Sequence, residues 1–198
     1  MSLRSPSAPT NEELACRAQQ GCVASFEQLL RRFQTPVLHF LRRRGHAAEA
    51  EDIAQDTFLR AYENLHRYDP QWRFSTWLFT IARRTSLNAQ RRKRPTTDPA
   101  AVDAAVSSDR SPLDVLVRSE SRRRIWDIAA QLLSEEQWTV LWLHYVENMP
   151  LQEVARVVNR SRPSVKVAMF RARRKLAARL EEWKQSPSPS VACEASDE

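Results

Sequence analysis

The chain has 198 residues, a formal net charge of +7 and an isoelectric point near 9.9. Its length accommodates one domain or two small ones, and its cationic excess favours a polyanionic partner, most simply nucleic acid. Two glycines and no sustained alternation of apolar and polar residues argue against a sheet and predict an all-α fold. No apolar run approaches bilayer-spanning length, and residues 1–10 lack the apolar core of a signal peptide. We therefore expect a cytoplasmic protein without membrane insertion.

Nothing in the sequence indicates an enzyme. The three cysteines, Cys16, Cys22 and Cys193, lack close pairing, so free thiols are expected rather than a metal site. The histidines are scattered without metal-ligand spacing: His39, His46, His66 and His144. No nucleophile–base motif, glycine-rich phosphate loop or paired carboxylate signature is present. We expect no catalytic residue, no metal and no cofactor.

Two helices are predicted in the first 44 residues. Thr10 and Glu13 form a possible capping box for the first helix, which Gly21 can end. The second spans about 25–44, with a kink or break expected at Pro36. Its apolar stripe comprises Phe26, Leu29, Leu30, Phe33, Val37, Phe40 and Leu41. Its basic last turn, Arg42, Arg43 and Arg44, either faces nucleic acid or complements the helix dipole, and we favour the dipole.

Residues 51–94 hold two helical segments joined by an aromatic loop. Helical spacing predicts that the first segment buries Ala54, Phe58, Ala61 and Leu65. The opposite face carries Leu59 among polar residues, namely Asp52, Gln55, Asp56, Arg60 and Glu63. An exposed leucine is ordinary, but one ringed by charges is also typical of the centre of a docking patch.

The second segment is predicted to bury Phe74, Trp77, Leu78 and Ile81 and to turn Thr80, Arg83, Arg84 and Arg91 outward. The loop before it holds His66, Tyr68, Trp72 and the turn-forming pair Asp69 and Pro70. An acidic helix, an aromatic loop and a basic helix in one hairpin suggest two different partners. A solvated hairpin with no partner is the alternative.

Residues 95–112 are small, polar and bounded by prolines, which predicts a flexible linker that lets the two halves move independently. A helix is expected over 113–133, with apolar positions Val117, Ile125, Ile128, Ala129 and Leu132. Ser134 and Gln137 predict a capping box for the next helix. That helix carries Trp138, Leu141, Trp142 and Tyr145, and Asn148 suits its end. Residues 1–9 and 184–198 are expected to be disordered.

A short helix at 151–158, a turn at 159–162 and a long basic helix to about Trp183 predict a helix-turn-helix. The buried stripe of the long helix comprises Val165, Met169, Ala172, Leu176 and Leu180. Its opposite face shows Ser164, Val167, Phe170, Arg171 and Arg174, with Lys166 and Arg173 at the edges. Arginine and lysine at this density suit phosphate contacts, and Arg171 can reach a guanine edge. A solvated basic helix on a bundle is the alternative.

These patterns carry a family resemblance. The stretch AEDIAQDTFLRAYENLHRYDP followed by FSTWLFTIARR resembles the second conserved region of bacterial RNA polymerase sigma factors of the extracytoplasmic-function (ECF) group, in the sigma-70 superfamily. The stretch LLSEEQWTVLWLHYVENMPLQEVARVVNRSRPSVKVAMFRARRKL resembles the fourth. The resemblance implies a region 2 domain at 10–94, the linker at 95–112, a region 4 domain at 113–183 and a tail at 184–198.

The resemblance also implies partners and site residues. Core RNA polymerase would bind through the clamp helices of its largest subunit and the flap of its second-largest subunit, and an anti-sigma factor is a further expected partner. The clamp helices would meet Asp52, Gln55, Asp56, Leu59 and Arg60. The −10 element of promoter DNA would meet Tyr68, Asp69, Gln71, Trp72, Thr80, Arg83, Arg84 and Asn88. The −35 element would meet Arg162, Ser164, Lys166, Val167, Phe170, Arg171 and Arg174.

Several positions depart from the family pattern. Asn159 stands where glycine is frequent, and Pro163 and Ser164 replace a common Gly-Thr pair, yet both changes are compatible with the turn and the first helical turn. Val167 is apolar where a polar residue is frequent, which favours contact with a thymine methyl or readout of DNA shape. Arg84 stands where asparagine is common, which shifts that contact toward charge.

Two other functions are compatible with parts of the sequence. A sigma-like decoy would bind an anti-sigma protein without reading DNA, but it has no need of Arg83, Arg84, Arg171 and Arg174. A plain repressor or activator would leave the charged face around Leu59 unexplained. We therefore expect a two-domain initiation factor that gives RNA polymerase promoter specificity and performs no covalent chemistry.

Overall fold

The computed structural model describes residues 8–44, 46, 48–93 and 124–185. The regular elements in these residues are all helical. The N-terminal domain contains α1 (Asn11–Gln19), α2 (Val23–Arg43), α3 (Ala50–Glu63), the 3₁₀ turn η1 (Leu65–Arg67) and α4 (Phe74–Lys93). The C-terminal domain contains a helical stretch at 124–132 followed by α6 (Glu135–Tyr145), α7 (Leu151–Val158) and α8 (Arg162–Gln185). The predictions for 95–112, for Val117 and for the tail from residue 186 lie outside the described residues.

The helix ends follow the local signals of the sequence. Both predicted capping boxes are present, one between Thr10 and Glu13 and the other between Ser134 and Gln137. Positive φ angles occur at 93° in Gly21, 52° in Asn148 and 55° in Asn159. Asparagine tolerates this left-handed conformation, so α7 ends without the glycine that is frequent there. The left-handed conformation of Asn159 therefore marks where the short helix α7 ends.

Helix α2 continues through Pro36, so of the two expected alternatives, a kink or a break, the break is excluded. Proline in a helix interior removes one backbone hydrogen bond and costs about 3 kcal/mol. The flanking turns offset that cost, because Phe33, Val37 and Phe40 are buried on the face that α2 turns to the core. Burying a side chain of this size contributes roughly 1.5–3 kcal/mol each.

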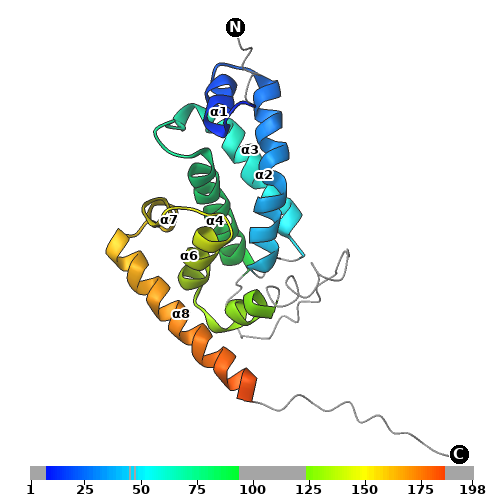
Figure 1. Cartoon of the computed structure of the whole chain (residues 1–198). Helices are drawn as coiled ribbons and strands as arrows, with labels where there is room; N and C mark the ends of the chain where they lie inside the picture. Colours follow the sequence, from blue (N-terminus) through cyan, green and yellow to red (C-terminus); the bar gives the residue numbers. More distant parts are fainter. Residues whose placement is uncertain (1–7, 45, 47, 94–123, 186–198) are drawn as a thin grey trace, which may run out of the picture.

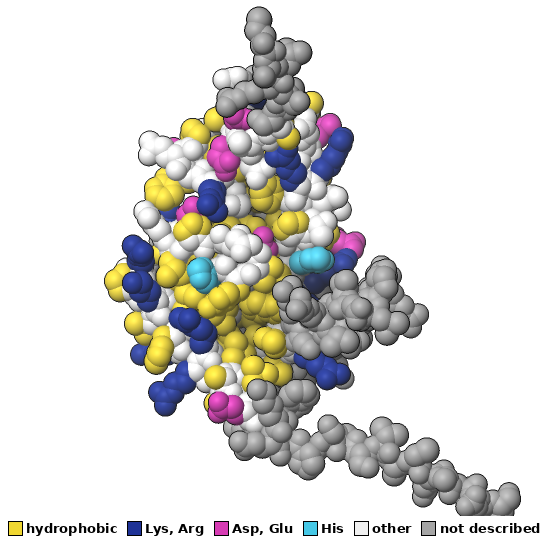
Figure 2. Space-filling view, in the orientation of Figure 1, with side chains coloured by type: hydrophobic (Ala, Val, Ile, Leu, Met, Phe, Trp, Pro, Cys, Tyr) yellow, Lys and Arg dark blue, Asp and Glu magenta, His cyan; other side chains and the backbone are white. Residues whose placement is uncertain are grey.

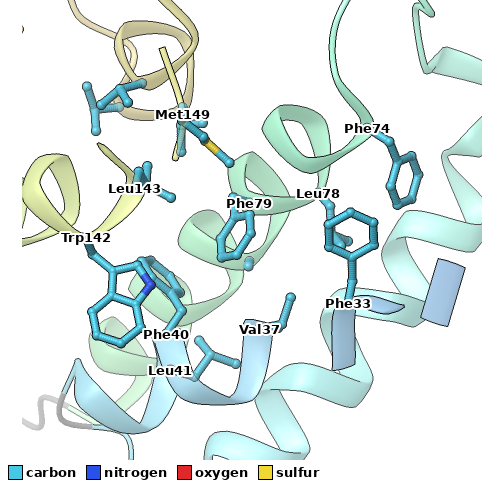
Figure 3. Close-up of a cluster of buried hydrophobic side chains, with 14 of the residues drawn as sticks. Phe33, Val37, Phe40, Leu41, Phe74, Leu78, Phe79, Trp142, Leu143 and Met149 are labelled. Carbon is cyan, nitrogen blue, oxygen red and sulfur yellow. The ribbon is translucent and has the colours of Figure 1, made fainter. Parts of the chain in front are cut away.

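A single hydrophobic core runs through both domains (Figure 3). The ring of Phe40 in α2 lies 5.4 Å from that of Phe79 in α4 and 5.6 Å from that of Trp138 in α6, measured between centroids. Leu143 and Met149 of the C-terminal domain belong to the same buried cluster. The two halves therefore pack against each other, which differs from the expectation that they move independently.

The contact between the domains is centred on α4 and α7, which lie side by side (Figure 1). Phe79 is fully buried there, although the sequence analysis did not place it among the apolar positions of α4. It follows Leu78 by about 100° around the helix, so burying both residues widens the apolar face of α4. The wider face is what a second domain covers.

None of the helices within the described residues has the length and hydropathy that a bilayer crossing needs.

Candidate polymerase and nucleic-acid interfaces

The outer face of α3 borders an apolar groove of about 500 Å³ between α2 and α3. Leu59 lies at this groove and is 57% exposed, and Tyr62 beside it is 49% exposed. The apolar part of the lining comprises Phe26, Leu30, Leu38, Ala54, Phe58, Leu59 and Tyr62. The rings of Phe26 and Tyr62 meet edge to face at 5.0 Å, which fixes one wall. An exposed apolar groove of this kind fits a helix of another protein.

Charged side chains surround the groove and the exposed leucine. Arg60 donates to Asp56 at 2.9 Å one helical turn earlier, and Arg42 of α2 donates to Glu51 at 2.8 Å. Asp52 and Gln55 are exposed as the sequence analysis expected. The apolar floor was missed as a site, because Phe26 and Leu30 fit the buried stripe of α2 and gave no sign of a gap beside α3.

The loop between α3 and α4 is built around Tyr68, which is only 4% exposed. Its hydroxyl donates to the backbone oxygen of Trp72 at 2.7 Å, and its ring packs against Phe74 and Trp77 at 5.6 Å. Burial raises the pKa of Tyr68, with further contributions from nearby negative groups including Glu12. The resemblance assigned Tyr68 to the −10 element, but here its ring is buried in the core and its hydroxyl holds the loop backbone.

Helix α1 braces the same loop through residues that the sequence analysis did not identify. Gln19 donates its side-chain amide to the backbone oxygens of Leu65 and Tyr68 at 2.9 and 2.8 Å. Glu12 accepts the backbone N–H of Phe74 at 3.0 Å, which satisfies one free donor in the first turn of α4. These partners are 46 to 62 residues apart in sequence, so no local sequence pattern predicts the contacts between them.

The tip of the loop presents polar groups and one aromatic ring. Asp69 accepts the backbone N–H of Gln71 at 3.0 Å and so closes the turn, and both side chains are exposed. Trp72 is half-buried. The guanidinium of Arg156, from α7, lies 3.3 Å from the centroid of its ring. The loop thus offers a stacking surface that already has an arginine on it.

The residues of α4 that were predicted to face outward differ in their exposure. Arg84 and Asn88 are exposed, as expected. Thr80 is half-buried, and its hydroxyl donates to the backbone oxygen of Thr76 at 2.7 Å. For Arg83 the expectation of an outward side chain is wrong, because only 14% of it is exposed and it forms a fork on Glu135 of the C-terminal domain at 3.1 Å.

The outer face of α8 is open. Phe170 is 63% exposed and Val167 is 48% exposed, whereas Val165 and Met169 on the other side are buried. The remaining predicted residues of this face are exposed, apart from half-buried Ser164: Arg162, Lys166, Arg171 and Arg174. Lys and Arg side chains follow the outer edge of the molecule that α8 forms (Figure 2). This face combines phosphate-binding charge with apolar side chains that can meet base edges.

In the described part of the chain, no three His, Cys, Asp or Glu side chains gather in a way that could hold a metal ion. Cys16 and Cys22 are free thiols.

Comparison with known proteins identifies the class to which this fold and these faces belong. Residues 29–96 match the family model for Sigma-70 region 2, and residues 125–176 match that for Sigma-70 region 4. The chain is 31% identical to RNA polymerase sigma-H factor of Pseudomonas aeruginosa over 174 residues, which covers 82% of this chain and 90% of that protein. It is also 31% identical to ECF RNA polymerase sigma factor SigW of Bacillus subtilis over 146 residues, 69% of this chain and 78% of that protein.

A solved structure shares the arrangement. CnrH in complex with the cytosolic domain of CnrY is 26% identical and superposes with a TM-score of 0.65, covering 87% of this chain and 97% of that one. The chain therefore belongs to the sigma-70 family, in the ECF group of RNA polymerase sigma factors. The resemblance drawn from the two conserved stretches is confirmed, and so is the expectation of a protein that is not an enzyme.

Proposed function

We propose that this sigma factor binds core RNA polymerase through the α2–α3 groove and directs it to promoters through two separate DNA-reading faces. The observation that carries the proposal is the exposure of Leu59 beside an apolar groove, ringed by Asp52, Gln55, Asp56 and Arg60. A buried anchor in an apolar groove with a charged rim is the usual anatomy of a protein interface. The clamp helices of the polymerase's largest subunit are the proposed occupant, and the flap of the second-largest subunit is a proposed partner of the C-terminal domain.

The −10 element is the proposed ligand of the α3–α4 loop and of α4. Asp69, Gln71 and Trp72 form the tip of the loop, and Thr80, Arg83, Arg84 and Asn88 continue along α4. An unstacked base can lie on the ring of Trp72 while arginines contact the strand's phosphates. Tyr68 contributes by holding the loop, since its hydroxyl fixes the backbone at Trp72.

The −35 element is the proposed ligand of α8, which enters the major groove as the second helix of a helix-turn-helix does. In this proposal Arg171 reads a base edge and Arg174 contacts phosphate, which is supported by the exposure of both side chains. Val167 and Phe170 supply apolar contact with thymine methyl groups. The protein acts in the cytoplasm, and an anti-sigma factor is a proposed further partner, since the similar protein CnrH is bound by the cytosolic domain of CnrY.

The decoy alternative has less support, because the curated relatives that match this chain over most of their length carry the name RNA polymerase sigma factor. A decoy also has no use for the exposed arginines of α8.

Leu59→Arg tests the docking face. The substitution places a charge in the apolar groove, so we expect a loss of about 2 kcal/mol or more in binding to core polymerase. The matched control is Val23→Arg, because Val23 is 54% exposed and does not line the groove. Both variants should keep the helical signal in circular dichroism. Co-purification with core enzyme and run-off transcription from genomic fragments are the measurements, and equal activity of the two variants would refute the assignment.

A further inference from the structure

One carboxylate of the C-terminal domain lies between two arginines of the N-terminal domain. Glu135, in the first turn of α6, accepts from Arg44 at the C-cap of α2 at 2.5 Å, and from Nε and one terminal nitrogen of Arg83 of α4 at 3.1 Å. The hydroxyl of Thr139 donates to the same carboxylate at 3.1 Å. The side chain of Arg44 is 4% exposed and that of Glu135 is 32% exposed, so the arginine end of this ion pair is shielded from solvent.

A second carboxylate repeats the arrangement one helix later. Glu153 of α7 is buried and accepts from the hydroxyl of Thr76, while its other oxygen lies 3.4 Å from Nε of Arg73. Arg156, one turn further along α7, covers the ring of Trp72. Arg73 and Thr76 belong to the loop end and first turn of α4, beside the proposed −10 ligands.

These contacts resemble those that a bound DNA strand would make, with carboxylates in place of phosphates and a guanidinium in place of a stacked base. An arginine fork on a carboxylate uses the donors and the geometry that it uses on a phosphate, and a cation over Trp72 occupies the surface on which a base would stack. The occupied groups, Arg83 and Trp72, are among those assigned to the −10 element, and Arg73 and Thr76 are their neighbours. The two glutamates therefore occupy donor groups of Arg83 and Arg73 that could otherwise contact backbone phosphates.

We propose that the free protein closes on itself, with the C-terminal domain covering the −10 face and Glu135 and Glu153 taking the place of DNA phosphates. The inference rests on the proposed function, because it names the regulation of the same −10 face. Promoter opening then requires that the two carboxylates leave Arg83 and Arg73.

The contact between the two domains contains buried polar groups that weaken it. The Nε atom of Arg44 and the indole N–H of Trp138 are buried without a hydrogen-bond partner among the described residues, and both residues contact Phe40. A buried polar group without a partner destabilises the state that buries it. Opening would hydrate such groups, so the contact holds the domains together without being locked.

The closure is selective. The α2–α3 groove keeps Leu59 57% exposed, and α8 keeps Phe170 63% exposed. A closed protein can therefore still meet polymerase and duplex DNA, whereas the single strand of the −10 element is excluded. The test is designed around this difference.

The test compares Glu135→Gln/Glu153→Gln with Glu27→Gln/Glu136→Gln in the full chain. The control also removes two carboxylate charges, but from residues that do not join the domains. Glu27 pairs with Arg31 and Glu136 with Arg160, each within its own domain. The probes are fluorescein-labelled random-sequence oligonucleotides, single-stranded and duplex, followed by fluorescence anisotropy. If about a tenth of the free protein is open, breaking the closure should tighten single-strand binding roughly tenfold relative to wild type and control. Duplex binding should stay the same for the two double variants.

Small-angle X-ray scattering of the same samples measures closure directly, and we expect a larger radius of gyration only for the Glu135/Glu153 variant. Equal radii and equal single-strand affinities of the two double variants would overturn the inference. If circular dichroism shows that the variant has lost helicity, Arg156→Ala takes its place, because the Arg156 side chain is exposed and its removal uncovers Trp72. Run-off transcription by wild type separates the two proposals. If wild type supports transcription but the two double variants do not differ, only the closure proposal is refuted. If wild type does not support transcription, the proposed function is refuted, and the scattering data still test the closure.

Discussion

Two basic helices of this sigma factor, α4 and α8, each carry a phenylalanine followed four residues later by an arginine, yet the phenylalanine is covered in α4 and open in α8. On α4, Phe79 precedes Thr80 and Arg83 and is fully buried. On α8, Phe170 precedes Arg171 and is 63% exposed. An aromatic residue beside arginines therefore does not reveal whether a helix face meets a partner domain or solvent. What differs is the neighbour, since α7 and α6 supply Glu153, Glu135 and apolar surface to α4.

The largest effect on the free energy of unfolding should come from Phe79, the buried one of these two phenylalanines. Phe79→Ala removes a ring from the core shared by both domains and should lower the free energy of unfolding by about 3–5 kcal/mol. Phe170→Ala removes an exposed ring and should change it by roughly 0.5 kcal/mol or less. Urea unfolding followed by circular dichroism gives both values. Similar values for the two variants would mean that α4 is as open as α8 in the free protein.

The sequence predicted the helices well because their signals are local. The capping boxes at Thr10 and Ser134 and the left-handed residues Asn148 and Asn159 each depend on neighbours within a few residues. The exposed face of α8 and the exposure of Leu59 followed from helical periodicity alone.

The contacts between domains could not be predicted in this way. Arg44 and Glu135 are 91 residues apart, and Thr76 and Glu153 are 77 apart, so no spacing rule connects them. The basic end of α2 was attributed to the helix dipole, whereas Arg43 pairs with Asp127 at 2.5 Å and Arg44 with Glu135. Tyr68 was assigned to DNA through the family resemblance, whereas its burial depends on Phe74, Trp77 and a hydrogen bond from Gln19 of α1.

The open face of α8 should separate two kinds of contact. Arg171→Ala should cost about 1–3 kcal/mol at one base pair of the −35 element and relax discrimination there. Arg174→Ala should weaken all upstream sequences alike and lower the slope of log K against log salt by about one. Binding to a panel of single-base variants of a selected promoter, at several salt concentrations, measures both. Loss of discrimination with Arg174→Ala would reverse the two roles.

A smaller effect on stability is expected from the contact between Arg156 of α7 and Trp72 in the loop before α4. Arg156 lies over Trp72 at 3.3 Å, and such a cation–π contact contributes roughly 0.5–2 kcal/mol. A double-mutant cycle of Arg156→Ala and Trp72→Leu on the free energy of unfolding should return a coupling in that range. The same cycle with Arg160→Ala should return no coupling, because Arg160 pairs with Glu136 instead. Coupling in both cycles would indicate a general effect of charge rather than the stacked pair.

The smallest effect expected is a pH dependence that distinguishes the two faces. Burial raises the pKa of Glu135, but hydrogen bonds from Arg83 and Thr139 and the charges of Arg44 and Arg83 outweigh burial, so the net pKa lies below the ordinary 4.5. A carboxylate with a lowered pKa stabilises the closed state above its ordinary pKa, and this contribution is lost as the pH falls through the lowered value. Scattering should therefore show wild type expanding as the pH falls below about 4.5.

Other carboxylates are also protonated in this range, so the comparison needs two variants. Glu135→Gln cannot lose a charge at that position, and its radius of gyration should change less between pH 7 and pH 4 than that of wild type. Glu136→Gln keeps the Glu135 carboxylate between Arg44 and Arg83 and should expand as wild type does. If Glu135→Gln and Glu136→Gln expand equally, the acid response does not come from the covered face of α4. Duplex binding by the open face of α8 should show no difference between the two variants at either pH, because Glu135 contacts α2 and α4 rather than the outer side of α8.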